Sequence, residues 1–378
     1  MSFEVKGWCP GALRPMESGD GWVVRVRVPG GRMTASQAQG IAAAAARHGN
    51  GLIDLSARAN VQLRGVTMDS HPALIGALRG LGLIDSDESA EARRNIVVQP
   101  FWAAGDGTAE MAAALAEALA ATDLPLPGKF GFALDTGARP VLRGLSCDIR
   151  VERRGEGFLV LADGAMTGAV VAGTDVPQAA LDLARWFVAT GGISAGRGRM
   201  RPHLAQAALP AAFREAPRAE GPDFVAKSGP CPGGALVALA FGQMRAETLA
   251  ALADHGALRV TPWRMLLVEG VTAPPAIPGL LTDPEDPLTR VVACTGAPGC
   301  PQARRATRDL AARLAPAVPV GRLLHVSGCA KGCAHPFPAD LVLTATGDGF
   351  DLIRNGRAGD AALAHLTPDQ ITPESLTF

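Results

Sequence analysis

The sequence predicts an α+β protein made of two copies of one plan, and its internal repeats carry this expectation. Residues 148–164 align without a gap with residues 340–356. Both segments begin with Asp, place Gly-x-Gly-Phe at the same offset and end in Asp-Gly or Asn-Gly. Each is typical of a β-hairpin: an apolar strand, a glycine turn and a second strand. Shorter matches recur in the same order: 9–11 with 231–233, 65–67 with 270–272, and Arg94 with Arg290.

Each copy is expected to begin with a small β-α-β-β unit. WVVRVRVP (22–29) alternates like a half-buried strand, and 36–49 has the composition of a helix. Two further strands are predicted at 51–56 and 61–66. The second copy repeats the order over 235–241, 244–256, 257–262 and 265–271. Such a unit forms a small α+β sandwich.

A larger part follows in each copy, with helices such as 108–121 and 178–189 expected around a mixed sheet. We therefore expect half-domains at 1–85 and 230–285, larger α/β domains at 86–200 and 286–378, and a linker at 201–229 that is rich in Gly, Pro and Arg.

Composition narrows the function classes. The chain has 378 residues, 48% of them hydrophobic, and a formal net charge of zero. A neutral chain gives no electrostatic reason to expect nucleic acid or an anionic membrane as a partner. The first residues carry no secretory signal pattern, and no apolar run approaches the ~20 residues of a bilayer span. We expect a cytoplasmic protein.

Four of the seven cysteines form the strongest chemical motif. Cys294-x5-Cys300 is followed by Cys329-x3-Cys333. Each pair follows a predicted strand, so the four thiols are expected to converge on one iron–sulfur cluster. Pro301 is predicted to begin a helix whose N-terminus would stabilise the thiolates. Zinc is the alternative, although zinc sites usually space each cysteine pair by two to four residues.

The remaining cysteines and the histidines are less informative. Cys147 is expected to be buried in a strand, and Cys9 and Cys231 to share a structural role because they recur in the repeat. His203 and His335 are the histidines considered for contact with iron or substrate.

The cysteine arrangement resembles that of the sulfite/nitrite reductase superfamily. Within this superfamily, the sequence is most similar to the precorrin-3B synthases of aerobic cobalamin biosynthesis. The resemblance implies a pseudo-twofold duplicated fold with two ferredoxin-like half-domains and two larger α/β domains. It also implies a [4Fe–4S] cluster on the four cysteines. The segments that carry it are 8–29, 53–66, 126–135, 294–303 and 325–336.

The resemblance also implies a substrate site of basic residues. Arg58, Arg94 and Lys129 match basic positions of the superfamily, and Arg64 joins them as a predicted anchor, because a guanidinium can grip a carboxylate with two hydrogen bonds. Gly131 replaces a second lysine that would suit a small oxyanion, which leaves room for a larger substrate. Weaker candidates are Arg197, Arg199 and Arg201. No catalytic residue is assigned.

The implied reaction is oxidation of precorrin-3A by O₂ at C20, with a lactone formed from the ring A acetate. The resemblance further implies a mononuclear non-haem iron, no siroheme, and electrons from a separate NADH-dependent reductase. The sequence shows neither a facial triad for that iron nor a nucleotide-binding glycine fingerprint. Two alternatives stay open: a siroheme-dependent sulfite or nitrite reductase, and a non-enzymatic, metal-stabilised tetrapyrrole-binding protein.

Overall fold

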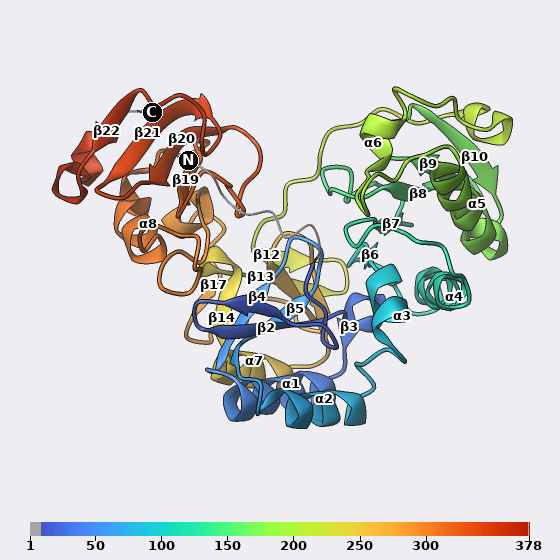
Figure 1. Cartoon of the computed structure of the whole chain (residues 1–378). Helices are drawn as coiled ribbons and strands as arrows, with labels where there is room; N and C mark the ends of the chain where they lie inside the picture. The colour runs from blue at the N-terminus through green and yellow to red at the C-terminus, as the bar shows by residue number, and fades with distance from the viewer. Residues whose placement is uncertain (1–8, 377) are drawn as a thin grey trace.

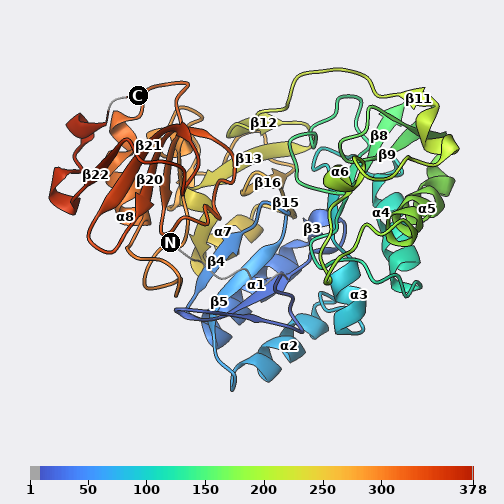
Figure 2. The ribbon, with the colours of Figure 1, turned by 45° about the horizontal axis from the view of Figure 1, so that its top comes forward.

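In the computed structural model, the described residues are 9–376 and 378, and they form four sheets (Figure 1). Two sheets make up a central unit with helices beneath it, and one α/β domain stands on each side of this unit (Figures 1 and 2). The duplicated α+β architecture predicted from the repeats is confirmed. Residues 1–8, on which the expectation about a signal segment largely depends, lie outside the described residues.

The two central sheets belong to the two half-domains. In spatial order, the first contains β1 (Met16–Ser18), β2 (Gly21–Val26), β5 (Val61–Val66), β4 (Leu52–Leu55) and β14 (Gln243–Arg245). The second contains β12 (Gly229–Cys231), β13 (Gly234–Leu239), β16 (Met265–Glu269), β15 (Leu258–Val260) and β3 (Arg32–Met33), with β17 (Leu280–Leu281) beside β13. The β-α-β-β order predicted for each copy is present.

The half-domains exchange strands. β3 of the first copy pairs with β15 of the second, and β14 of the second copy pairs with β4 of the first. Arg32 on β3 adds an ion pair with Glu269 on β16, at 2.8 Å between Nη2 and Oε2. Separating the two half-domains would therefore break both sheets, so they form one interlocked body.

Helices α1 (Ala35–His48), α2 (His71–Gly80) and α7 (Ala246–Ala253) cover one face of the central unit (Figure 1). Helix α1 begins with a capping box, in which the Thr34 side chain and Gln37 satisfy free backbone N–H groups. Gln39 on α1 donates to the carbonyl oxygen of Ala250 on α7 at 3.0 Å. Buried residues of both copies, such as Ile41 and Leu249, share one hydrophobic core.

The two α/β domains have the same topology: three parallel strands and then two antiparallel ones. The first contains β6 (Ile96–Val98), β7 (Phe132–Asp135), β8 (Ile149–Arg154), β9 (Gly157–Ala162), β10 (Thr167–Val171) and the edge strand β11 (Ala216–Pro217), with helices α3 (Glu88–Arg93), α4 (Thr108–Ala120), α5 (Val176–Ala189) and α6 (Met200–His203). The second contains β18 (Val291–Ala293), β19 (Leu324–Ser327), β20 (Ala339–Ala345), β21 (Phe350–Gly356), β22 (Ala364–Leu366) and helix α8 (Arg308–Leu314).

The hairpin repeat is confirmed in its register. Ile149 faces Ala162 across β8 and β9, and Leu341 faces Arg354 across β20 and β21. These pairs occupy the same positions of the aligned segments, so the gapless alignment corresponds to equivalent backbone pairing.

The predicted linker is shorter than the sequence suggests. Thr167 on β10 pairs with Pro217 on β11, and the backbone N–H of Met200 donates to the Asp148 carboxylate at 2.8 Å. Residues 200–217 thus belong to the first α/β domain, and the connecting chain covers only the residues between β11 and β12. Among the described residues, no helix is long and apolar enough to cross a membrane.

Candidate cluster site and substrate cavity

The two cysteine pairs leave the same edge of the second α/β domain. Strands β18 and β19 are parallel, with Ala293 opposite Val326. Cys294 follows β18 directly, and Cys329 lies two residues beyond the end of β19. Because parallel strands present their carboxyl ends at one edge, both loops start side by side.

Hydrogen bonds join the two cysteine loops. The backbone N–H of Gly328 donates to Cys294 Sγ at 3.1 Å, and the N–H of Arg304 donates to the Gly328 carbonyl oxygen at 2.8 Å. A side chain at Gly328 would not fit, because a Cβ there would lie 2.7 Å from the Cβ of Ala303 and 3.3 Å from the sulfur of Cys294. A backbone amide directed at a thiolate stabilises its charge, as at iron–sulfur sites.

The four thiols of these loops are free and close enough to influence one another. Burial raises the pKa of Cys333, and the neighbouring Cys329, Cys294 and Cys300 raise it further. The pKa of Cys329 is also raised, first by burial and then by Cys294 and Cys300. The raised pKa values of Cys329 and Cys333 suit a positively charged metal centre, because coordination deprotonates thiols and offsets the repulsion.

Four cysteine thiols are a usual ligand set for a [4Fe–4S] cluster. No group of three or more His, Cys, Asp or Glu side chains in the described part of the chain is arranged to hold one ion. In a [4Fe–4S] cluster each cysteine binds a different iron, so the sulfurs stand farther apart than the ligands of one ion. The predicted mononuclear iron finds no ligand set among these residues.

The prediction that a helix begins at Pro301 is wrong. Helix α8 begins at Arg308, and residues 301–307 form turns and irregular chain. Arg304 bonds to Gly328 of the other cysteine loop, and Thr307 Oγ1 donates to the carbonyl oxygen of Cys294, in the same loop, at 2.7 Å. The cross-links take the place of the helical turns that the sequence suggested.

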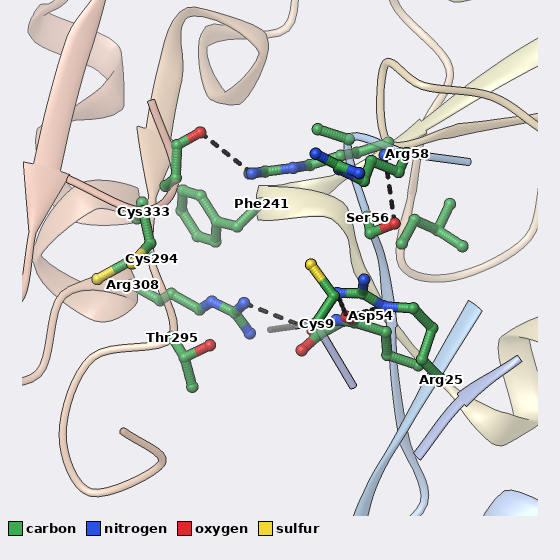
Figure 3. Close-up of a pocket in the computed structure, with 16 residues that line it drawn as sticks. Cys9, Arg25, Asp54, Ser56, Arg58, Phe241, Cys294, Thr295, Arg308 and Cys333 are labelled. Atoms are coloured by element: carbon green, nitrogen blue, oxygen red, sulfur yellow. Dashed lines mark hydrogen bonds and ion pairs between the residues drawn. The ribbon is translucent and has the colours of Figure 1, made fainter. Parts of the chain in front are cut away.

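A cavity of about 340 Å³ lies between the cysteine loops and the half-domains (Figure 3). Cys294 and Cys333 lie on one side of it, and Cys9, Arg25 and Arg58 lie on the other. The volume is within the range of pockets that hold organic ligands, roughly 300–1,000 Å³. We call this space the interdomain cavity. Its lining residues are Cys9, Arg25, Asp54, Leu55, Ser56, Ala57, Arg58, Gln62, Phe241, Arg264, Ala293, Cys294, Thr295, Arg308, Cys333 and Ala334.

Arginine dominates the charge of the interdomain cavity. Arg308 reaches from α8 toward Asp54 on β4, at 3.5 Å between Nη2 and Oδ1 (Figure 3). Arg25 donates from Nη2 to Gln62 at 2.7 Å, and Arg264 also lines the space. Arg25, Arg264 and Arg308 were not predicted from the sequence. Only the alternation of residues 22–29 placed Arg25 on a definite strand face; the other two carry no local signal.

One of the predicted substrate residues, Arg58, lines this cavity, and it contacts a second, Lys129. Arg58 lines it and donates from Nη1 to the Lys129 carbonyl oxygen at 2.9 Å. Lys129 itself is exposed. Burial would raise the pKa of Cys9, but Arg25, Arg58 and Lys129 outweigh it, and the pKa falls below its usual value. The charge of these residues therefore favours an anion at this wall of the cavity.

The structure does not place Arg64 and Arg94 in the cavity lining. The Arg64 side chain is 4% exposed and bonded to Asp20 and Asp54. Arg94 is paired with Asp85 at 2.6 Å and lines a different pocket. Carboxylates have taken up both guanidinium groups, and a role of these two arginines in substrate binding stays a prediction.

The weaker candidates are also occupied elsewhere. Arg199 pairs with Asp148, and Arg201 pairs with Asp163. His203 is buried in the core of the first α/β domain, with Nε2 2.7 Å from Thr190 Oγ1. His335 is near the cysteine loop, and its Nε2 lies 3.2 Å from the Pro338 carbonyl oxygen.

Gly131 is buried, with no room for a side chain. A Cβ at this position would lie 2.9 Å from Asn95 Nδ2, which donates to the Phe130 carbonyl oxygen. Lys129 is in the preceding turn and not on strand β7. Gly131 also precedes this strand, which begins at Phe132.

A larger cavity of about 640 Å³ lies under the connecting chain, beside the first α/β domain. It is lined by Arg139, Arg143, Arg153 and Phe224, among others, and by no cysteine. The interdomain cavity remains the candidate active site, because it is lined by cysteines of the two cysteine loops and the larger cavity is not.

Known proteins match this arrangement at the levels of domain, chain and fold. Residues 14–81 match the family described as the nitrite/sulfite reductase ferredoxin-like half domain. A precorrin-3B synthase of Sinorhizobium sp. is 30% identical over 407 aligned positions, which cover 95% of this chain and 85% of that protein. The solved structure of the Mycobacterium tuberculosis NirA protein superposes with a TM-score of 0.66 at 18% identity, covering 93% of this chain and 78% of that one, and it shows that the fold is shared.

Proposed function

The chain belongs to the precorrin-3B synthase family, and on this basis we propose that it oxidises precorrin-3A with O₂ at C20 and closes a lactone from the ring A acetate, giving precorrin-3B. One observation carries the proposal: both cysteine loops and a set of arginines meet at one interdomain cavity. The cysteine loops are suited to hold a centre for electron transfer, and the arginines are suited to bind a polycarboxylated substrate.

We assign the ligands of a [4Fe–4S] cluster to Cys294, Cys300, Cys329 and Cys333. The bond from Gly328 to Cys294 Sγ and the effect of the other three thiols on Cys333 support this assignment. A bound cluster would supply single electrons next to the cavity. The chain's own contribution is to hold the thiols at one edge of the sheet and to keep the cluster beside the substrate.

The tetrapyrrole is proposed to lie in the interdomain cavity with its carboxylates toward Arg25, Arg58 and Arg308. Guanidinium groups bind carboxylates with two parallel hydrogen bonds, which fixes both position and orientation. Phe241 provides an apolar surface in the same cavity. The residues that surround the substrate therefore come from both half-domains and from the second α/β domain.

The proposed reaction balances with an external reductant. One oxygen atom of O₂ enters the product as the hydroxyl group at C20, and the other leaves as water. The oxygen atom that enters the product first bridges C20 and the neighbouring ring carbon. The acetate carboxylate then forms its C–O bond to the ring carbon, whose bond to the bridging oxygen breaks, and the oxygen takes the electron pair and a proton as the C20 hydroxyl. Two electrons and two protons complete the balance, and we propose that a separate NADH-dependent reductase supplies them.

The test is to reconstitute the protein anaerobically with iron and sulfide, add precorrin-3A and a chemical reductant, and then admit O₂. Formation of precorrin-3B, with one oxygen atom from ¹⁸O₂ in the product, supports the proposal. Sulfite turnover without oxidation of precorrin-3A would point to a reductase and overturn the synthase assignment. Binding of precorrin-3A with no turnover under any of these conditions would also overturn it.

A further inference from the structure

Arg264 is the cavity arginine that reaches the cysteine loops from another domain. It lies in the turn between β15 and β16 of the second half-domain. Its Nη2 donates to the carbonyl oxygen of Ala334, the residue that follows Cys333, at 3.1 Å. It lines the interdomain cavity together with Cys294 and Cys333.

The backbone and the packing around Arg264 are specialised. Its φ angle is 60°, a left-handed conformation that non-glycine residues rarely adopt. Gly242 leaves the space for its side chain, because a Cβ on Gly242 would lie 2.7 Å from the Cβ of Arg264 and 2.8 Å from its Cδ. An uncommon backbone conformation and a neighbour without a side chain together hold this arginine against the cysteine loop.

The positive charge of Arg264 lies close to the thiols of Cys294 and Cys333. Burial lowers its pKa, and Asp54, Cys294 and Cys333 act in the opposite direction by favouring the cation. A guanidinium stays protonated in proteins, so this position carries a fixed positive charge. A fixed charge in a partly buried site acts more strongly on its neighbours than it would in water.

We propose that Arg264 is a positioning residue for the cluster: it anchors the Cys333–Ala334 turn and raises the cluster's reduction potential. Reduction adds negative charge to the cluster, and a nearby cation stabilises the reduced state. The inference rests on the cluster assigned under the proposed function. It adds that a residue of the second half-domain, Arg264, tunes the potential at which the cluster accepts an electron.

The experiment compares cluster content and midpoint potential in the reconstituted holoprotein, by EPR-monitored redox titration. The variants are Arg264→Gln, which removes the charge, and Arg264→Lys, which keeps it. Arg322→Gln is the matched control, since Arg322 pairs with Asp340 near the opposite end of β19. We expect a more negative potential in Arg264→Gln, and potentials near that of the wild type in Arg264→Lys and Arg322→Gln.

An unchanged potential in Arg264→Gln with full cluster content would overturn the inference. If Arg264→Gln loses the cluster, a cluster retained in Arg264→Lys supports the inference. Loss of the cluster in both variants overturns the role of the Arg264 charge. A wild-type protein that forms no cluster would overturn the assigned cofactor and this inference with it, whereas a failure confined to the variants leaves the proposed function intact.

Discussion

Arg64 donates a hydrogen bond of 3.0 Å to the carbonyl oxygen of Gly299, which lies 235 positions later in the chain. Gly299 immediately precedes Cys300, and the Ser18 hydroxyl also donates to the Gly299 carbonyl oxygen, at 2.5 Å. The first half-domain thus holds the first cysteine loop. Arg64, predicted as a substrate anchor, joins two domains.

Removing Arg64 should destabilise the protein strongly. Arg64→Ala would leave Asp20 and Asp54 without their buried partner, and breaking a buried pair costs about 3–5 kcal/mol. Urea unfolding would measure this loss. Arg322→Ala removes a pair in which the arginine is 51% exposed, and we expect about 0–1 kcal/mol. Equal effects of the two variants would contradict the role given to Arg64.

Serine at each proposed ligand should abolish cluster assembly. The variants are Cys294→Ser, Cys300→Ser, Cys329→Ser and Cys333→Ser, since a hard oxygen is a poor substitute for a soft thiolate. EPR and iron and sulfide content would measure the result. Cys147→Ser should keep the cluster, because Cys147 is buried elsewhere and burial raises its pKa to about 12. Any one of the four variants with an intact signal would remove that ligand.

Cavity arginines should determine substrate affinity. Arg58→Ala and Arg308→Ala should each weaken binding of precorrin-3A by about 1.5–3 kcal/mol, the range for a hydrogen bond to a charged group. Anaerobic titration followed by absorbance would measure this. Arg94→Ala is the matched control, because Arg94 pairs with Asp85 outside the cavity. A comparable loss in Arg94→Ala would show that the cavity does not bind the substrate.

A side chain at Gly131 should act through packing and not through charge. Gly131→Ala and Gly131→Lys both place a Cβ 2.9 Å from Asn95 Nδ2, so both should lower the melting temperature. Formation of precorrin-3B should fall in the lysine variant, and no sulfite reduction should appear. Thermal melts and both activity assays would show this. A stable alanine variant alongside an unstable lysine variant would indicate that size or charge matters beyond the Cβ.

Asp135 should make stability fall as the pH rises. Burial raises the pKa of Asp135 from 3.8 to about 6, against hydrogen bonds from Leu142 and Val141. Below pH 3.8 the carboxyl is protonated in both states; above about pH 6 it is ionised in both, and the folded state carries the full cost of its buried charge. The contribution lost over this window is about 3 kcal/mol.

Comparison with Asp135→Asn isolates this effect. The unfolding free energy of the wild type relative to the variant should decline between about pH 4 and pH 6 and then stay level. Urea unfolding at a series of pH values would measure it. A difference that is independent of pH would show that Asp135 ionises in the folded protein as it does in the unfolded chain.

The sequence alone determined the duplicated plan, the β-α-β-β order of each half-domain and the cysteine motif. These features are local: alternation, capping residues, glycine turns and motif spacing are written in consecutive residues. The hairpin repeat 148–164 and 340–356 even fixed the pairing register, because both copies use the same turn positions.

Only the tertiary structure decided which basic residues face the cavity. Arg58, Arg64 and Arg94 were all predicted as substrate anchors, but Asp20 and Asp54 bind Arg64, and Asp85 binds Arg94. The strand exchange through β3 and β14 and the reach of Arg264 to Ala334 likewise join distant segments. A charge takes whichever partner the packed chain brings within hydrogen-bonding distance, and no local pattern encodes that distance.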